Sequence, residues 1–387
     1  MGWESHTKQV VEGRTILYVP DITVYAKRGE RVGPWSAPVF YNPNASATRD
    51  ISVGIVGALG SSPSVLDAMC GVGARGLRIA VESNASEVVI NDVNPDALEL
   101  AYMSVKANGV VGKVHIESVG AHALCAAYDY REGFDYVDVD PFGSAAPFVP
   151  AALLAVKRGG VLGVCSTDAA NLCGNRPEAL YRLYFAKNTY TLGVKEAGLR
   201  ILVGYVVRVA ATMGFAALPL LCYHYGDYFR CHFKLSRTSS VAQDLMKQIG
   251  YLHHCFDGLE YLGSAVCGKC GRLPEAGPLW TGRLTSGDFL RAVQARVGVV
   301  ESQSCVRATN LLQTLSIEDD VTLPYISVHR LVKGLGVSPP STQRLIMRLR
   351  AQGYAASATH FDPKGIKTDA PLNQVVDTIR HIGGKMV

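Results

Sequence analysis

The sequence has no long uninterrupted apolar run and little charge for its length of 387 residues. The most apolar stretch, Ile201 to Cys222, contains Arg208 and is interrupted by Gly214 and Pro219. A charge at that depth is costly in lipid, and proline breaks a helix. The N-terminal MGWESHTKQVVEG also lacks the apolar core of a signal peptide. We therefore expect a cytoplasmic protein with no membrane span.

Repeats, a collagen-like glycine period and low-complexity tracts are absent as well. With 48% hydrophobic and 18% charged residues, the composition excludes a disordered chain and a charged coiled coil. Ten cysteines without a signal peptide argue against a secreted disulfide scaffold. The net charge of +5 permits a polyanionic partner but does not by itself indicate one.

From residue 64 onward, short apolar runs alternate with longer amphipathic segments, which predicts a parallel sheet with crossover helices. A long helix in EAGLRILVGYVVRVAATMG precedes two strands that meet at Gly226-Asp227. A reversed hairpin that ends a parallel sheet is typical of class I S-adenosylmethionine (SAM) methyltransferases. The expected fold is therefore an α/β, Rossmann-like sheet with a terminal antiparallel hairpin. Its parallel strands are expected at residues 64–69, 87–93, 113–118, 134–140 and 159–167, and its helices near 75–83, 95–107, 120–128 and 145–157.

Three sections are predicted along the chain. Residues 1–60 form an N-terminal extension that contributes to the active site, with a strand in ITVYA (22–26) and a helix at its end. Residues 61–238 form the methyltransferase domain, and the polar SRTSS at 236–240 marks its boundary. Residues 239–387 form a smaller α+β domain, in which 326–361 reads as helix, turn, helix and strand, close to a winged helix.

A glycine-rich turn follows the first strand of the sheet. Asp67 is followed by Gly71, Gly73 and Gly76 in G-x-G-x-x-G spacing, which suits a pyrophosphate, the methionine part of SAM or a purely structural turn. Asp67 favours the cationic ammonium of SAM over a pyrophosphate. Asp92, after the second strand, is placed either to bind ribose hydroxyls or to cap the next helix.

The fourth strand ends in Asp140-Pro141-Phe142-Gly143. An acidic group, a proline carbonyl and a ring at this position suit a planar base with an exocyclic amine. Hydrogen bonds to Asp140 would shift the amine lone pair towards a methyl donor, Asp140 could take the proton, and Phe142 would stack on the base. The same four residues also suit a simple β-turn.

Several further sequence blocks occur in a characteristic order along the chain. They are VFYNP with RD (residues 39–50), DAMCGVGARG, INDVNPDAL, DVDPFGSAAPF, STDAANLCG, EAGLRILVGYVVR, CGKCG with GPLWTG, and SATHFDPKGIKTDAP. With these blocks, the chain resembles the tRNA (guanine-26 N2)-dimethyltransferase family of the Trm1 type, in its archaeal form, over nearly its entire length. This resemblance implies two methyl transfers from SAM to N2 of the guanine between the D and anticodon stems of tRNA.

The resemblance also implies roles for single residues. Asp140 matches the family's catalytic Asp, with Pro141 beside it, and Phe142 with Phe40 matches the aromatic pair that holds the guanine. Arg49 and Arg75 match contacts to the SAM carboxylate, although each could be an ordinary surface charge. Asp92, with Val93 next to it, matches the ribose ligand. Where the family has Asp-Ala for the adenine amine, this chain has Gly120-Ala121, so only backbone contacts are expected there.

A zinc site is implied less completely. Many relatives carry two Cys pairs, whereas here Cys267-x-x-Cys270 is intact and its partner pair reads Cys255 with Gly258. His253 or His254 could complete a Cys₃His site, and a decayed site would look the same.

The C-terminal section is expected to dock tRNA through its phosphates, and no obligate protein partner is expected. Two other functions stay open, namely a methyltransferase for another exocyclic amine in RNA or DNA and a non-catalytic nucleic-acid-binding protein. A dehydrogenase is the most distant alternative. The basic and aromatic residues that favour docking are Lys333, Arg344, Arg348, Arg350, Lys364, Lys367, Tyr354, His360 and Phe361.

Overall fold

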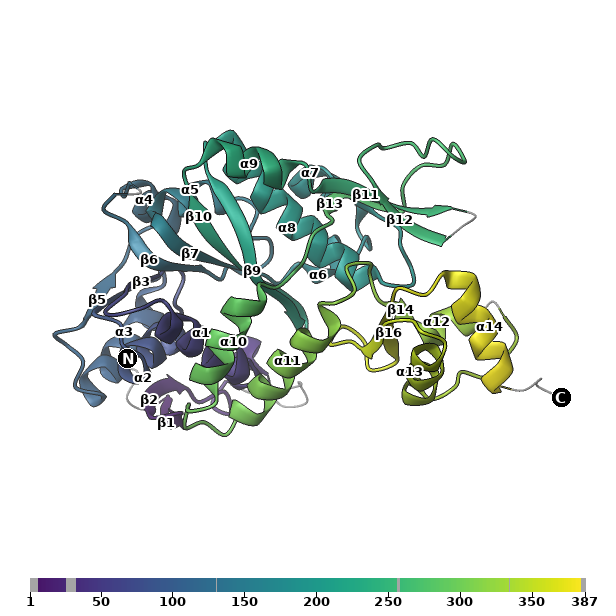
Figure 1. The fold of residues 1–387 in the computed structure, drawn as a ribbon. Helices are drawn as coiled ribbons and strands as arrows, with labels where there is room; N and C mark the ends of the chain where they lie inside the picture. Colours follow the sequence, from purple (N-terminus) through teal and green to yellow (C-terminus); the bar gives the residue numbers. More distant parts are fainter. Residues whose placement is uncertain (1–5, 26–32, 130, 256–257, 334, 384–387) are drawn as a thin grey trace. The chain divides into compact units, whose positions relative to one another are not determined.

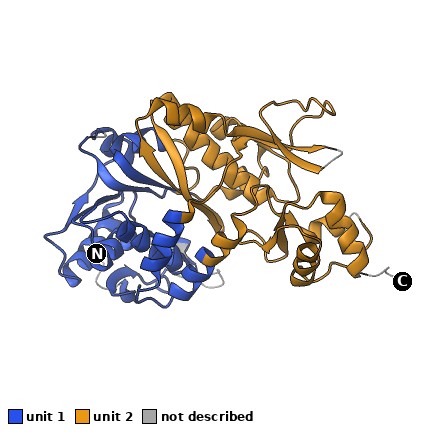
Figure 2. Cartoon of the chain, in the orientation of Figure 1, with its two compact units in different colours: residues 1–141, 148–165, 288–312 blue, residues 142–147, 166–287, 313–387 orange. Residues whose placement is uncertain are grey.

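The computed structural model describes residues 6–25, 33–129, 131–255, 258–333 and 335–383. The chain divides into two compact units (Figure 2). The first unit contains residues 1–141, 148–165 and 288–312, and the second contains 142–147, 166–287 and 313–387. These units follow contacts in space, and the three predicted sections 1–60, 61–238 and 239–387 stay a prediction.

A seven-stranded sheet has the order β5-β4-β3-β6-β7-β10-β9 (Figure 1). Parallel pairing joins β3 to β4 and β6, β4 to β5, and β6 to β7, while β9 and β10 pair antiparallel. The predicted Rossmann-like sheet with a terminal reversed hairpin is confirmed. The bounds are β3 Ser64–Asp67, β4 Glu87–Asn91, β5 Val114–Glu117, β6 Phe134–Val139, β7 Val156–Ser166, β9 Ala216–Tyr225 and β10 Tyr228–Ser236.

Apolar side chains explain the parallel strands of the first unit. Val65 and Leu66 in β3, and Val88 and Ile90 in β4, are fully buried. Strands covered on both faces read as continuous apolar runs, which is the pattern of a parallel sheet. The crossover helices are α2 (Ala74–Glu82), α3 (Pro95–Ala107), α4 (Ala121–Ala126) and α5 (Val149–Ala155).

Two local predictions in the first unit differ from the structure. The fourth helix begins at Val149 and not at residue 145, because Pro147 disfavours the helical conformation of Ala146. Residues 22–25 of ITVYA form a turn, and residue 26 lies outside the described residues. The strands of this section are instead β1 (Thr7–Glu12) and β2 (Thr15–Pro20), an antiparallel hairpin that precedes α1 (Ser46–Ala58). Helix α10 (Gly287–Val297) and the start of α11 (Cys305–Glu318) also belong to this unit.

The second unit is built around α8 (Val194–Thr212), which contacts β9 and β13. A four-stranded antiparallel sheet in this unit has the order β12-β11-β13-β8. Its strands are β8 Lys187–Asn188, β11 Ile249–Cys255, β12 Gly258–Leu262 and β13 Ala276–Trp280, and the short helices nearby are α6 Ala169–Leu172, α7 Pro177–Tyr184 and α9 Ser239–Met246.

The C-terminal part of the second unit has the predicted winged-helix order. Its strands and helices pack around a shared core that includes Leu345, Leu349 and Ile366. Ser341 caps α13 by accepting the Arg344 N–H at 3.3 Å, which fixes the start of that helix. The elements are β14 Ile326–Ser327, α12 Val328–Val332, α13 Thr342–Ala351, β15 Ala356–Ala358, β16 Gly365–Thr368 and α14 Leu372–Gly383.

Among the described residues, no helix has both the length and the apolar character needed to cross a membrane.

Candidate active site

The glycine-rich turn between β3 and α2 uses each of its three glycines differently. Gly71 and Gly73 have φ of +54° and +76°, a region that side chains strongly disfavour. Gly76 lies where the helix crosses β4, and a Cβ there would approach Ile90 Cγ2 at 2.4 Å. The spacing therefore sets a tight turn followed by close packing of α2 on the sheet.

Asp67 lies beneath this turn and is 2% exposed. Its Oδ2 accepts the Gly76 N–H at 3.0 Å. Burial, and then the negative charge of Asp138, raise the pKa of Asp67 to about 7. The carboxyl predicted to attract a cationic ligand is thus kept partly protonated near neutral pH.

We expect this carboxyl to make the protein less stable as pH rises. The folded chain holds the Asp67 proton more tightly than the unfolded chain, so the stabilisation is complete below about pH 4 and is lost as pH rises through about 7. Asp67→Asn should raise the free energy of unfolding at pH 8 by about 1–4 kcal/mol, with little change at pH 4. Urea unfolding at the two pH values measures this difference.

Asp135 supplies the matched control, because its pKa shifts in the opposite direction. Burial acts to raise the pKa of Asp135, but hydrogen bonds from Ser64 outweigh burial and lower it. Asp135→Asn should therefore lose stability at pH 8. An Asp67→Asn protein that is less stable than the wild type at pH 8 would contradict the expected sign.

Asp92 follows β4 and binds backbone on both sides. Its Oδ2 accepts the Gly71 N–H at 2.8 Å, and its Oδ1 accepts the Asn94 N–H at 2.9 Å. Val93 beside it is 68% exposed. The helix cap is Asn94, whose side chain accepts the Asp96 N–H. Asp92 therefore orders the glycine turn.

Asn91 is a site residue that the sequence reasoning missed. This buried amide donates to Ala68 O at 2.9 Å and to Val119 O at 3.0 Å, and it accepts the Val119 N–H at 3.0 Å. One side chain thus ties together the segments that follow β3, β4 and β5. Gly120 and Ala121, which begin α4, come directly after Val119. A polar residue at the end of an otherwise apolar strand was the available signal.

Arg75 joins the two acidic residues at the end of β6. Its Nε lies 3.0 Å from Asp138 Oδ2, its second terminal nitrogen lies 2.8 Å from Asp140 Oδ2, and the first donates to Ser52 Oγ at 2.8 Å. The Asp138 side chain is fully buried and also accepts the Tyr136 hydroxyl, whereas that of Asp140 is 29% exposed. The structure thus brings Arg75, predicted as a SAM contact, to the catalytic candidate Asp140.

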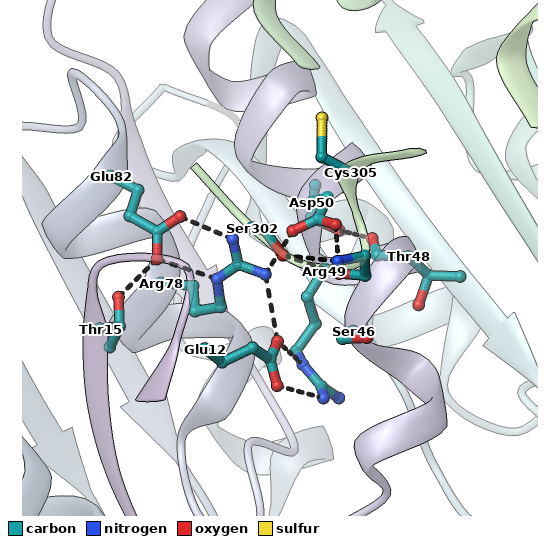
Figure 3. A network of polar contacts seen from close by, with 12 residues as sticks. Glu12, Thr15, Ser46, Thr48, Arg49, Asp50, Arg78, Glu82, Ser302 and Cys305 are labelled. Atoms are coloured by element: carbon teal, nitrogen blue, oxygen red, sulfur yellow. Dashed lines mark hydrogen bonds and ion pairs between the residues drawn. The ribbon is translucent and has the colours of Figure 1, made fainter. Parts of the chain in front are cut away.

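Arg49 lies in a buried ionic network (Figure 3). Its guanidinium binds both oxygens of Glu12 at 2.7 and 2.6 Å and also donates to Asn42 O. Tyr41 donates its hydroxyl to Glu12, and its ring lies below the guanidinium of Arg49. This predicted SAM contact therefore joins α1 to the N-terminal hairpin.

The remaining predicted base-binding residues fall in different units. Phe40 and Pro141 belong to the first unit, and Phe142 belongs to the second. Phe40 is 39% exposed, and its carbonyl would lie 3.6 Å from a Cβ on Gly71, so it borders the glycine turn. Pro141 is the last residue of this segment of the first unit. Phe142 begins a segment of the second unit and is 78% exposed.

The segment that carries Phe142 is held by residues that follow β7. Gly143 donates its N–H to Thr167 Oγ1 at 2.7 Å, and Thr167 returns a backbone hydrogen bond at 2.9 Å. Ser144 and Tyr184 join their hydroxyls at 2.7 Å, and Tyr184 also binds Asp168. The STDAA block thus supports the Phe142 loop, a role that sequence reasoning did not assign.

Three cysteine thiols converge in the second unit. Cys255 Sγ lies 3.1 Å from Cys267 Sγ and 3.5 Å from Cys270 Sγ. Hydrogen bonding from Cys255 lowers the pKa of Cys267 to about 7. Of the two candidate histidines, His253 contacts Ser264 O at 3.0 Å. Among the described residues, the group of side chains close enough together to ligate one metal ion consists of these three cysteines. Thiolates are zinc ligands, so these three residues fit the metal with one position left for another donor.

The basic and aromatic residues predicted to dock tRNA differ in their exposure to solvent. Lys367 is buried and bound to Glu196 at 2.8 Å, His360 is bound to Glu318, and Phe361 is 1% exposed. These three stabilise the interior of the second unit. Tyr354 is half-buried against the winged-helix core. The members that remain exposed are Lys333, Arg344, Arg348, Arg350 and Lys364.

A family model described as N2,N2-dimethylguanosine tRNA methyltransferase matches residues 13–380. The chain belongs to this family. Its relatives include the tRNA (guanine(26)-N(2))-dimethyltransferase of Thermococcus kodakarensis, which is 36% identical over 96% of this chain and 99% of the relative. The enzyme of the same description from Methanosphaerula palustris is also 36% identical, over 95% and 97% of the two chains.

A solved structure extends the similarity to the fold of the dimethyltransferase family. Trm1 from Pyrococcus horikoshii, in complex with S-adenosyl-L-methionine, matches with a TM-score of 0.84 and 31% identity. The match covers 96% of this chain and 99% of that one. The family resemblance expected from the motif blocks is confirmed over nearly the full chain.

Proposed function

We propose that this protein transfers methyl groups from SAM to the exocyclic N2 of guanine 26 in tRNA, giving N2-methylguanosine and N2,N2-dimethylguanosine. The observation that carries the proposal is the end of β6. There a partly exposed carboxylate, Asp140, is held by Arg75 from the helix that follows the glycine turn. Membership of the dimethyltransferase family supplies the substrate.

An exocyclic amine needs help to act as a nucleophile, because its lone pair is delocalised into the purine ring. Hydrogen bonds from the amine to Asp140 and to the Pro141 carbonyl localise that lone pair. The family resemblance gives Phe142 and Phe40 the role of stacking on the extruded base, which would offset the few kcal/mol needed to unstack it. N2 bonds to the methyl carbon as the carbon–sulfur bond breaks, and the N2 proton passes to Asp140.

The residues around the glycine turn suit a cationic donor. SAM supplies an electrophilic methyl group on a sulfonium. Gly71 and Gly73 let the backbone approach it, while Asp67 and Asp92 line the ends of β3 and β4. Gly120 and Ala121 offer backbone contacts to the adenine. The family resemblance gives Arg49 and Arg75 to the SAM carboxylate, and in the structure Arg49 pairs with Glu12 and Arg75 with Asp140.

The tRNA is held mainly through its phosphates. Arg344 and Arg348 lie one turn apart and are exposed on α13, whose buried side carries Leu345 and Leu349. Lys333 and Lys364 are exposed in the same winged-helix part. Exposed basic side chains at these positions suit contacts to the phosphates of the tRNA, which do not depend on the base sequence. A tRNA substrate also accords with the cytoplasmic location expected from the sequence.

The function is tested with purified protein, SAM and two tRNA transcripts that differ only in guanosine or adenosine at position 26. Nucleoside analysis should find N2-methylated guanosines in the first transcript and none in the second. Equal methylation of both would assign the enzyme to another guanine. Methylated adenine or cytosine would assign it to another exocyclic amine.

We also propose that Cys255, Cys267 and Cys270 hold a structural zinc ion. The purified protein should contain about one zinc per chain, and Cys267→Ser should remove most of it, because each thiolate supplies one of four ligands. A chelator should lower the melting temperature of the wild type, since a structural metal contributes to folding. Atomic absorption and thermal unfolding measure the two effects.

Cys165 gives the matched control, because it is buried in β7 and is not a member of the cluster. Cys165→Ser should keep its zinc. If wild-type protein reconstituted with zinc retains none after gel filtration, the three thiols are not a metal site.

A further inference from the structure

Helix α7 presents two exposed aromatic rings beside the Phe142 loop. Tyr181 is 66% exposed and Phe185 is 61% exposed. They lie four residues apart, with ring centroids 6.3 Å apart and an edge-on angle of 69°. Large apolar rings exposed together commonly mark a binding surface.

Phe185 also has a strained backbone. It ends α7 with φ of +52°, in the left-handed region, where its N–H bonds to Tyr181 O at 2.8 Å. Glycine or asparagine usually fills this position. A phenylalanine there destabilises the helix end and gains no burial in return, which points to a use for the ring outside the fold.

A hydrogen bond connects α7 to the segment 142–147, which carries Phe142. Tyr184, between the two exposed rings in sequence, is fully buried and binds Ser144 Oγ at 2.7 Å. Ser144 is two residues from Phe142, a span of at most about 7 Å. The exposed rings and Phe142 therefore belong to one supported region of the second unit.

The charge beside these rings favours a polyanion. Arg182 is exposed on the same helix and Arg176 is exposed at its N-cap, and no ion pair of either arginine is found among the described residues. Glu178 is the opposing exposed charge on α7. Arginine beside aromatic rings suits single-stranded nucleic acid, in which bases stack and phosphates bind the cation.

We propose that Tyr181 and Phe185 form a stacking platform for a nucleobase that flanks the target guanosine, with Arg182 on the adjoining phosphate. Extruding the guanosine unstacks its neighbours, and the platform holds one of them. The inference rests on the proposed function and adds a second base-binding surface to it.

Phe185→Gly separates stacking from folding. Glycine removes the ring and relieves the positive φ, so the melting temperature should not fall. The affinity for the tRNA transcript should fall about 5- to 100-fold, as is usual when a stacking ring is lost. SAM affinity should be unchanged, kcat at saturating tRNA should change less than twofold, and Phe185→Trp should restore tRNA affinity. Tyr181→Ala should reproduce the loss.

Tyr102→Ala is the matched control, since Tyr102 is an exposed ring with Lys106 over it on α3. It should bind tRNA as the wild type does. Stacking itself is read from 2-aminopurine placed on either side of the target guanosine, whose fluorescence should be quenched by the wild type and not by Phe185→Gly. Unchanged tRNA affinity in Phe185→Gly and Tyr181→Ala, or an equal loss in Tyr102→Ala, would overturn the platform. Failure of the proposed function would instead appear as no methylation by the wild type.

Discussion

Replacing Asp140 by alanine should lower kcat for methyl transfer about 10²- to 10⁴-fold, the usual cost of losing a proton acceptor that touches the reacting group. In the proposed mechanism the carboxylate orients the exocyclic amine and receives its proton, and alanine can do neither. Arg75 keeps Asp138 and Ser52 as partners, so the end of β6 should stay folded. Single-turnover methylation of tRNA, with SAM affinity measured by calorimetry, separates chemistry from binding.

Two further variants sharpen that result. Asp140→Asn can still accept a hydrogen bond from the amine but cannot accept its proton, so its rate should lie between those of the wild type and Asp140→Ala. Asp135→Asn changes a carboxyl at the opposite end of β6 and should leave kcat within about twofold. If Asp140→Ala retains wild-type kcat, proton transfer and orientation do not depend on this residue.

Replacing Arg78 by methionine should destabilise the protein by about 3–5 kcal/mol, the usual result of breaking a buried ionic cluster from one side. Arg78 is completely buried and binds Glu12, Asp50 and Glu82 at 3.1, 2.5 and 2.6 Å (Figure 3). Methionine fills similar space but carries no positive charge, so the three buried carboxylates lose the cation that they share. Urea unfolding followed by circular dichroism measures the loss.

Arg291→Met is the matched control for this prediction. Arg291 pairs with Asp288 on the surface of α10, where such pairs contribute about 0–1 kcal/mol. Its removal should hardly change unfolding. If the Arg78→Met protein is as stable as Arg291→Met, the buried carboxylates do not depend on Arg78, and the prediction is wrong.

The order of strands and glycines could be predicted from sequence because it depends on local patterns. Apolar runs identified the parallel strands, and the spacing of Gly71, Gly73 and Gly76 identified the turn. The exposed ring of Phe142 follows from its place just beyond a strand end. These features need no knowledge of distant residues.

The partners of charged residues could not be predicted in this way. Arg49 binds Glu12 from 37 positions away, and Arg75 binds Asp140 from 65 positions away. Lys367, expected on the tRNA surface, is buried with Glu196 from 171 positions away. These ion pairs form between residues far apart in the sequence, which only folding brings together. The sequence therefore identifies a basic residue but does not show whether an acidic partner binds it.

Asn91 also has a consequence for the segment that follows β5. The backbone of Val119 is anchored by an amide outside its own loop, so the identity of residues 120 and 121 has little influence on where that loop lies. A short segment positioned from a neighbouring strand can change its sequence and keep its shape. A change of residue at Gly120 or Ala121 would then alter the side chains that this segment presents and leave its position intact.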